Sequence, residues 1–274
     1  MGIWHEIIIQ ILTIGTTYYL MRQLSENKVI CAMTTLLYVI CPYRLYLLRT
    51  GTDLGRMIVF TVLPLLIAFA SALLKKERTW LYLFLTAVCI GIISYADVVA
   101  SCFIIAFVGA YALWVRAWRL LVAMLGGIAL SCMEWLKLIK YLLTGVTDWQ
   151  DVSLAGIMPG AYTLGRYLST YFYPAGKPGI GILAVVVLML LLWLVMTDAE
   201  YRLPKPYRFT LFGVVMTGFM ASVWFPWDII QRVSVVFLRF VPLIGELNVF
   251  VGMMSLGISI LSTDVLDKFI KKLK

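Results

Sequence analysis

Long, unbroken apolar runs are the feature that most constrains this sequence. A helix needs roughly 20 apolar residues to cross a bilayer core about 30 Å thick. Runs close to that length lie at about residues 3–21, 29–48, 57–74, 80–96, 98–115, 119–134, 179–197, 207–225 and 247–263. Because backbone groups in lipid must pair within the spanning structure, and because the runs lack the alternation of barrel strands, we expect helices. The predicted fold class is all-α, a polytopic transmembrane helix bundle of about nine spans that forms one domain over residues 1–274.

Composition and charge agree with this interpretation. Hydrophobic residues make up 62% of the chain and charged residues 14%, against about 45–50% and about 25% in a soluble domain. The net charge of +9 comes from Lys and Arg residues scattered at the ends of apolar runs, so no nucleic-acid partner is expected. The five cysteines have no CxxC spacing, and we expect buried thiols without metal or redox chemistry.

The basic residues also predict an orientation in the membrane. An N-out, C-in arrangement puts fourteen of the 23 Lys and Arg residues on the cytoplasmic side, in short loops that carry the positive-inside bias. These fourteen are Arg22, Lys28, Lys75, Lys76, Arg78, Arg116, Arg119, Arg202, Lys205, Arg208, Lys268, Lys271, Lys272 and Lys274. We therefore expect an integral protein of the cell membrane with its N-terminus outside.

Two longer segments, at about 135–178 and 226–246, fall on the outer side in this orientation. In the first segment, Lys137 and Lys140 share one helical face, which favours a helix lying in the membrane interface with both lysines at lipid phosphates. The opposite face holds Trp135, Leu138, Ile139 and Leu142. The second segment has a similar amphipathic pattern, so interfacial helices are expected on the outer face.

The turn between the second and third runs carries the densest positive charge. Arg44, Arg49 and Arg56 lie close together in the sequence, with Asp53 between the last two. Because planar guanidinium groups bind phosphate through paired hydrogen bonds, these arginines are predicted to hold a lipid phosphate. The alternative is that they extend to lipid headgroups while Asp53 forms a local ion pair with Arg49 or Arg56.

Acidic residues supply the candidates for chemistry. Asp97 lies in a tight turn between two runs, where an ionisable group is costly unless it is paired or hydrated; the alternative is an ordinary turn residue. Asp148 and Asp151 flank a tryptophan in the outer loop and are candidates for acceptor binding, while Tyr171 is a candidate for stacking on a sugar. No cofactor is expected, and a divalent cation at the loop aspartates is an open alternative.

Five short motifs follow one another between about residues 10 and 260. They read Tyr38-Val-Ile-Cys-Pro-Tyr-Arg-Leu-Tyr46, Leu63-Pro-Leu65, Ile93-Ser-Tyr-Ala-Asp97, Phe225-Pro-Trp-Asp228 and Pro242-Leu-Ile-Gly245. In this order they resemble the YfhO-like group of bacterial polytopic membrane proteins, which is related to the GT-C glycosyltransferases.

The resemblance implies a GT-C-like fold that acts on polyprenyl-phosphate-linked sugars. Asp53 is a catalytic candidate because the family's Arg/Gly turn usually leads to an acidic residue; here Arg56 takes that place and Asp53 lies three residues earlier. Asp97 is the other catalytic candidate, because of its place in the tight turn between two runs. The family keeps a catalytic carboxylate in a first outer loop that would precede this sequence. We therefore expect a chain that lacks the N-terminal spans, with a partner chain that supplies them as one alternative.

Three functions follow from these observations. The leading one is a GT-C-like membrane protein that binds a polyprenyl-phosphate-linked sugar, or a similar membrane lipid, and transfers the sugar to a cell-envelope acceptor; whether it is an enzyme is left open. The second is a transporter or flippase component whose path is lined by Thr16, Thr17, Ser71, Thr86 and Ser131. The third is a non-catalytic, truncated membrane subunit.

Overall fold

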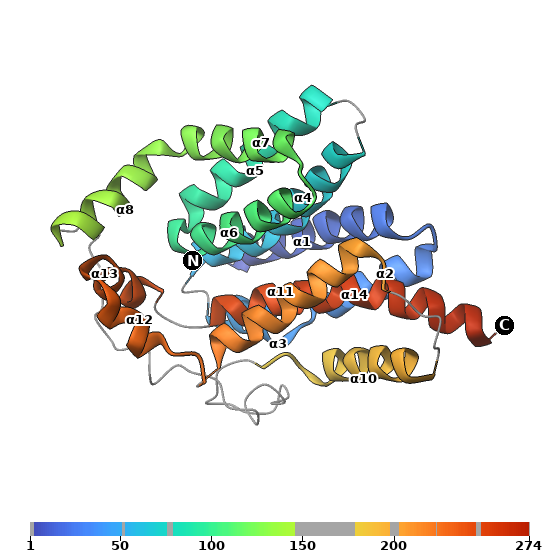
Figure 1. Ribbon diagram of the computed structural model, residues 1–274. Helices are drawn as coiled ribbons and strands as arrows, with labels where there is room; N and C mark the ends of the chain where they lie inside the picture. The colour runs from blue at the N-terminus through green and yellow to red at the C-terminus, as the bar shows by residue number, and fades with distance from the viewer. Residues whose placement is uncertain are drawn as a thin grey trace. The chain divides into compact units, whose positions relative to one another are not determined.

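The computed structural model describes residues 3–50, 53–75, 79–145, 179–197, 203–222, 224–244 and 248–273 (Figure 1). The secondary-structure elements of these residues are all α-helices, which confirms the predicted all-α class. The helices belong to two compact units, and each unit is described by itself.

Unit 1 comprises Met1–Asp53, Tyr162–Ser222 and Asn248–Lys274. Its helices are α1 (Ile3–Leu24), α2 (Lys28–Val39), α3 (Pro42–Thr50), α10 (Ile182–Thr197), α11 (Lys205–Ala221) and α14 (Asn248–Leu273). Unit 2 comprises Leu54–Ala161 and Val223–Leu247. Its helices are α4 (Leu54–Leu74), α5 (Thr79–Ala96), α6 (Val98–Trp114), α7 (Trp118–Leu130), α8 (Cys132–Thr144), α12 (Trp227–Val233) and α13 (Val235–Leu243).

Three helical segments are long and apolar enough to cross a membrane alone. They are Leu54–Leu74, Thr79–Ala96 and Val249–Lys271. Two bent pairs also qualify if each is counted as one span: α2 with α3, bent by 50°, and α7 with α8, bent by 79°. The described residues therefore hold three to five candidate spans, and the predicted nine are not confirmed.

The remaining apolar runs are helical but too short or too polar for a full span. α6 has 17 residues, about 25 Å at 1.5 Å per residue, which is less than the bilayer core of about 30 Å. α1 is longer, but it includes His5, Glu6 and Gln10 in its first half. The run at 29–48 is broken at Cys41, because the residue before Pro42 is disfavoured in helical geometry and proline suits the first position of a new helix.

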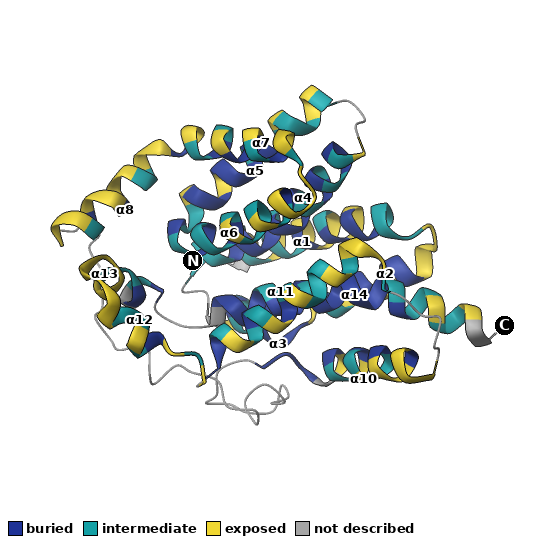
Figure 2. Ribbon diagram, viewed as in Figure 1, coloured by how far each residue is buried: buried dark blue, intermediate teal, exposed yellow. Residues whose placement is uncertain are grey.

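Unit 1 is built around α14, which contacts α1, α2, α3, α10 and α11. Figure 2 shows much of α14 as buried, and its candidate span is 83% buried. The packing against α11 is close, because a Cβ added to Gly257 would lie 2.5 Å from Cγ2 of Val214. Against α10, Val265 packs on Leu191 and Leu194.

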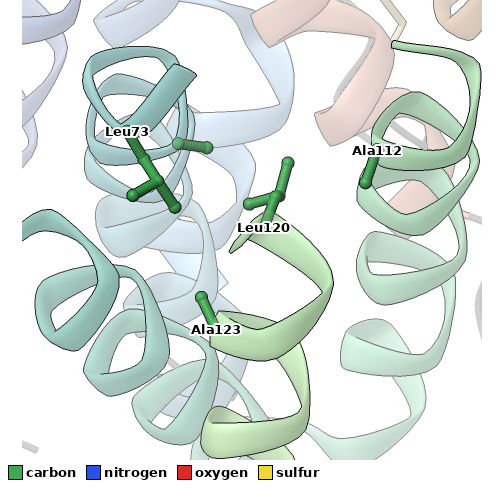
Figure 3. Close-up of a cluster of buried hydrophobic side chains, with 5 residues drawn as sticks. Leu73, Ala112, Leu120 and Ala123 are labelled. Atoms are coloured by element: carbon green, nitrogen blue, oxygen red, sulfur yellow. The ribbon is translucent and has the colours of Figure 1, made fainter. Parts of the chain in front are cut away.

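Unit 2 is built around α5, which contacts α4, α6, α7 and α8. Figure 3 shows one buried cluster of small and aliphatic side chains shared by three helices. Its members are Ala70 and Leu73 of α4, Ala112 of α6, and Leu120 and Ala123 of α7. The cluster fixes the ends of α4 and α6 against the start of α7.

Glycine lets α5 and α7 approach closely. A Cβ added to Gly127 would lie 2.5 Å from Cβ of Ile90 and 2.8 Å from the carbonyl oxygen of Ala87. A Cβ at Gly126 would lie 3.4 Å from Cβ of Ala87, and one at Gly91 would lie 3.4 Å from Cβ of Leu130. Residue numbers rise together on the two helices, so α5 and α7 run parallel with small residues at the contact, as in packed membrane helices.

The C-terminal end of α8 is fixed by a contact with α13. Gly145 follows the helix with φ 74°, the left-handed conformation that glycine adopts most easily after a helix. Arg239 of α13 donates a hydrogen bond from Nη1 to the carbonyl oxygen of Leu142 at 2.8 Å. Arg239 thereby satisfies one of the carbonyl groups that a helix leaves open at its end.

Candidate functional site

One end of unit 2 brings together two residues predicted from separate arguments. Arg56 lies in the first turn of α4 and Asp97 lies between α5 and α6. Nε of Arg56 is 3.5 Å from Oδ2 of Asp97, and the two side chains are 16% and 19% exposed. This contact is longer than the roughly 2.7–2.9 Å of a tight charge-assisted hydrogen bond. The termini of three helices therefore meet at a partly buried, oppositely charged pair.

Asp97 is positioned by its place at the start of α6. Its backbone is extended, and its Oδ1 accepts a hydrogen bond from the Ala100 N–H at 2.9 Å, which caps the helix. The N-terminus of α6 and the guanidinium of Arg56 thus both place positive charge beside the Asp97 carboxyl group. Asp97 therefore has a structural role as the residue that caps α6 after the turn. Its catalytic role stays a prediction.

A buried hydroxyl group lies one helical turn before Asp97. Ser94 of α5 is fully buried, and its Oγ has no hydrogen-bond partner among the described residues. Buried polar atoms in folded proteins are nearly always satisfied by protein, water or ligand. Ser94 therefore adds a buried hydroxyl group, without a partner among the described residues, one helical turn from Asp97.

The opposite end of the same helices carries a second polar contact. Nη1 of Arg119, at the start of α7, donates to Oγ1 of Thr79, at the start of α5, at 3.3 Å. The N-out interpretation assigns the turns before these helices to one side of the membrane and the turns at Arg56 and Asp97 to the other. Within unit 2, Arg56 and Asp97 lie together at one end of α5, and Thr79 and Arg119 lie together at the other end.

Arg44 has surroundings that the sequence did not suggest. Its side chain is fully buried in unit 1. Nη2 donates to Oγ1 of Thr13 at 2.5 Å and to Oε1 of Gln10 at 3.4 Å, both on α1. The side chain of Arg44 has no exposed area, so it does not extend to lipid headgroups in this structure. Its predicted contact with a lipid phosphate stays a prediction. Burial follows from the break at Pro42, which turns α3 against the bundle.

The α1 residues around Arg44 form a polar stripe that we did not predict. Gln10, Thr13 and Thr17 recur at intervals of three and four residues and therefore share one face of the helix. Nε2 of Gln10 donates to the Val39 carbonyl at 3.2 Å, so this face also holds the end of α2. The spacing of Gln10, Thr13 and Thr17 by three and four residues within an apolar run could have indicated this polar face from the sequence.

Comparison of this chain with protein-family models, with curated proteins and with solved structures finds no match. The resemblance to the YfhO-like and GT-C proteins is not tested by these comparisons and stays a prediction.

The other predicted site residues are placed separately. Arg49 is exposed in the last turn of α3, and Asp53 is half-buried just before α4. Arg44 belongs to unit 1 and Arg56 to unit 2, so the three-arginine phosphate clamp stays a prediction. Lys137 and Lys140 are exposed on α8, where Nζ of Lys137 lies 2.7 Å from Oε1 of Glu134.

The outer loop at 146–178 lies outside the described residues. Asp148, Asp151 and Tyr171 fall within it, so their predicted roles in acceptor or sugar binding are not addressed by the structure. Among the residues that are described, no group of three or more His, Cys, Asp or Glu side chains is placed to hold a metal ion. The divalent-cation alternative at Asp148 and Asp151 thus concerns only the undescribed loop.

Four of the five hydroxyl groups predicted to line a transport path bond within their own helices. Thr16, Ser71, Thr86 and Ser131 donate to carbonyl oxygens three or four residues earlier, at 2.6 to 3.1 Å. Such local bonds satisfy a hydroxyl in an apolar surrounding without a partner helix or water. Thr17 differs, because it is fully buried and its Oγ1 has no hydrogen-bond partner among the described residues.

Proposed function

We propose that this chain is a multi-pass integral protein of the cell membrane that binds a phosphate-bearing lipid through Arg56, beside Asp97. The observation that supports this proposal is the partly buried ion pair where the ends of α4, α5 and α6 meet. A guanidinium at such a boundary can hold a phosphate group while the lipid tail stays in the bilayer. The proposed ligand is a polyprenyl-phosphate-linked sugar, as the family resemblance implies.

The membrane part of the proposal is supported by helix length and by exposed apolar surface. Among the described residues three to five candidate spans are present, and α1 and α10 carry large apolar side chains that are exposed. These include Trp4, Ile8, Ile11 and Leu12 of α1, and Met189, Leu192, Val195 and Met196 of α10. Exposed patches of this extent on a soluble protein would drive association, whereas lipid covers them at no cost.

The proposed orientation is N-out and C-in, with the lipid phosphate at the extracytoplasmic face. It is supported by the bias of basic residues toward the short inner loops. The grouping of Arg56 with Asp97 at one end of unit 2, and of Thr79 with Arg119 at the other, agrees with the predicted alternation of these turns between the two sides of the membrane.

Sugar transfer at this site would use the two charges in different roles. Arg56 would bind the phosphate and stabilise the negative charge that it gains as the bond between the sugar C1 and the phosphate oxygen breaks. Asp97, released from Arg56, would accept the proton of an acceptor hydroxyl whose oxygen forms the new bond to C1. The products are the glycosylated acceptor, the lipid phosphate and a protonated Asp97, which then loses its proton to water.

Lipid affinity of purified variants tests this proposal. Arg56→Lys keeps the charge but loses the planar fork, so it should already weaken binding of polyprenyl phosphate. Arg56→Ala should weaken it by roughly ten- to a hundredfold, since a charge-assisted contact contributes about 1.5–3 kcal/mol. Arg119→Ala, an exposed arginine at the opposite end of unit 2, is the matched control and should bind normally. Wild-type affinity in folded Arg56→Ala protein would overturn the proposal.

A second function is favoured by unit 1. The bent pair of α2 and α3 has a buried arginine directly after the break, and transporters build their substrate sites from such discontinuous helices. We propose transport of an anionic solute or lipid headgroup as the alternative. Arg44→Gln would then abolish anion flux in proteoliposomes while Arg56→Ala would not, and the lipid-binding proposal predicts no protein-dependent flux in either case.

A further inference from the structure

Helix α8 presents three kinds of surface around its axis. Leu138 and Tyr141 are buried against the rest of unit 2. Leu136, Ile139 and Leu143 are 59%, 48% and 69% exposed, and they follow the exposed Cys132 at helical spacing on one stripe. Figure 2 shows most of α8 as exposed. An apolar stripe of this length is therefore uncovered by the described protein.

Two positive charges border this apolar stripe. Lys137 and Lys140 are exposed and lie beside Leu136 and Ile139 along the same edge of the helix. Lysines at that position can lay their alkyl stems over the apolar stripe. Nζ of Lys137 also donates to Oε1 of Glu134 at 2.7 Å, and an ammonium group has three donors, so this contact is compatible with a bond to a lipid phosphate. An apolar stripe with a lysine border is the pattern of a helix that lies in the surface of an anionic membrane.

The bend before α8 puts the helix at a suitable depth and angle. α7 has 13 residues, about 20 Å in length, so it ends about 10 Å short of crossing a core of about 30 Å. The chain then turns by 79° into α8. When α7 starts at the opposite boundary and runs along the membrane normal, a helix nearly at right angles to its end lies parallel to the membrane surface, at the depth of about 5–10 Å that interfacial helices occupy.

A contact at the far end of α8 keeps it in this direction. Arg239 donates to the Leu142 carbonyl, and its guanidinium lies beside Gly145. The helix is therefore fixed to unit 2 at both ends, by α7 at its start and by α13 at its end. Because α8 is already fixed in this direction, little conformational entropy is lost when its apolar stripe contacts lipid, and this favours association of the helix with the membrane.

We propose that α8 is a membrane-surface helix whose Cys132–Leu143 stripe enters the acyl layer and whose Lys137 and Lys140 bind the phosphates of anionic lipids. The occupant of this stripe is the lipid bilayer in which the chain sits. The proposal rests on the part of the proposed function that places the chain in a membrane, and not on its lipid substrate. It assigns to α8 a contact with bulk lipid, separate from the Arg56–Asp97 pair.

Native Cys132 offers a direct test of depth. Cys31, Cys41, Cys89 and Cys102 are replaced by Ala, and Cys132 is labelled with a nitroxide in vesicles of phosphatidylcholine and phosphatidylglycerol. Collisions with oxygen should be frequent and collisions with a water-soluble nickel chelate rare. A label at Glu26→Cys, in the exposed turn after α1, is the aqueous reference. Nickel accessibility at Cys132 equal to that reference would overturn the proposal, and Ile139→Cys repeats the measurement if the Cys132 label disturbs folding.

The lysine border is tested by lipid composition. The double change Lys137→Gln and Lys140→Gln should weaken association of spin-labelled phosphatidylglycerol by about fivefold per lysine. The double change to Arg keeps both charges and is the matched control, with near wild-type association. Equal association in the Gln and wild-type proteins would overturn the anionic-lipid contact. The depth readout at Cys132 does not involve Arg56 or Asp97, so failure of this proposal is distinguishable from failure of the lipid-substrate proposal.

Discussion

Arg44 of α3 donates a hydrogen bond from Nη2 to Oγ1 of Thr13 on α1, and both side chains are fully buried. The bond joins two helices of unit 1 at the place where the α2–α3 segment bends. A guanidinium keeps its charge in proteins, so each buried contact that it makes with a polar group offsets part of a large cost of removing it from water.

The first prediction follows from this bond. Thr13→Val keeps the shape of the side chain but removes a bond to a charged donor, which should destabilise the protein by about 1.5–3 kcal/mol. Thr16→Val is the matched control, because Thr16 bonds only to a carbonyl of its own helix, and it should cost less than about 1 kcal/mol. Thermal unfolding in detergent, followed by tryptophan fluorescence, measures both. Equal midpoints for the two variants would contradict the prediction.

Asp97 allows its structural and electrostatic roles to be separated. Asn and Ser both cap helices well, so Asp97→Asn and Asp97→Ser should keep most of the stability, while Asp97→Ala should lose about 1 kcal/mol through the cap. All three variants remove the charge beside Arg56. If Asp97 takes part in sugar transfer, all three should lose transfer activity, although only the Ala variant loses stability. Transfer activity retained by folded Asp97→Asn would restrict Asp97 to its capping role.

The adjacent glycines of α7 predict opposite outcomes for the same change. Gly127→Ala would put a Cβ 2.5 Å from Ile90, and such overpacking should cost about 1–3 kcal/mol. Gly126→Ala meets Ala87 at an ordinary 3.4 Å, so the better helix propensity of alanine should leave it neutral or more stable. Detergent stability of the two variants, measured side by side, checks the prediction. A destabilised Gly126→Ala with a normal Gly127→Ala would show that the α5–α7 contact is different.

Orientation in the membrane is predicted for two positions that lie outside the described residues. In a cysteine-free background, a thiol at Gly160→Cys should react with a membrane-impermeant reagent in intact cells. A thiol at Lys76→Cys should react only after permeabilisation. The reverse pattern would contradict the N-out, C-in arrangement and would place the Arg56–Asp97 pair on the cytoplasmic side.

The sequence predicted the helical class because apolar runs exclude other spanning structures. It did not predict the breaks between α2 and α3 and between α7 and α8. An apolar run is identified by counting apolar residues, and Pro42 was counted as part of such a run. It placed Arg56 and Asp97 on the same side, since the order of turns along the chain determines their side. Their contact could not be predicted, because it depends on how α4, α5 and α6 pack.

Arg44 shows a second limit of prediction from the sequence. A positive charge in an apolar run was interpreted as a surface group, since burial of an arginine is rare. The polar stripe of Gln10 and Thr13 that receives it lies on another helix, and nothing local links the two segments. The hydroxyl groups of Thr86 and Ser131 illustrate the opposite case, because their bonds to their own helices follow from a local rule.

The close approach of α5 to α7 has a consequence for how the chain is assembled. α6 lies between these helices in the sequence, so the surface around Gly91, Ala87 and Ile90 is made before its partner is. Until α7 arrives, lipid or α6 must occupy that surface, and the glycine contact can form only by displacing the earlier occupant. Assembly of unit 2 is therefore expected to include an exchange of neighbours, and substitutions at Gly127 should increase the lifetime of the state in which α5 has not yet met α7.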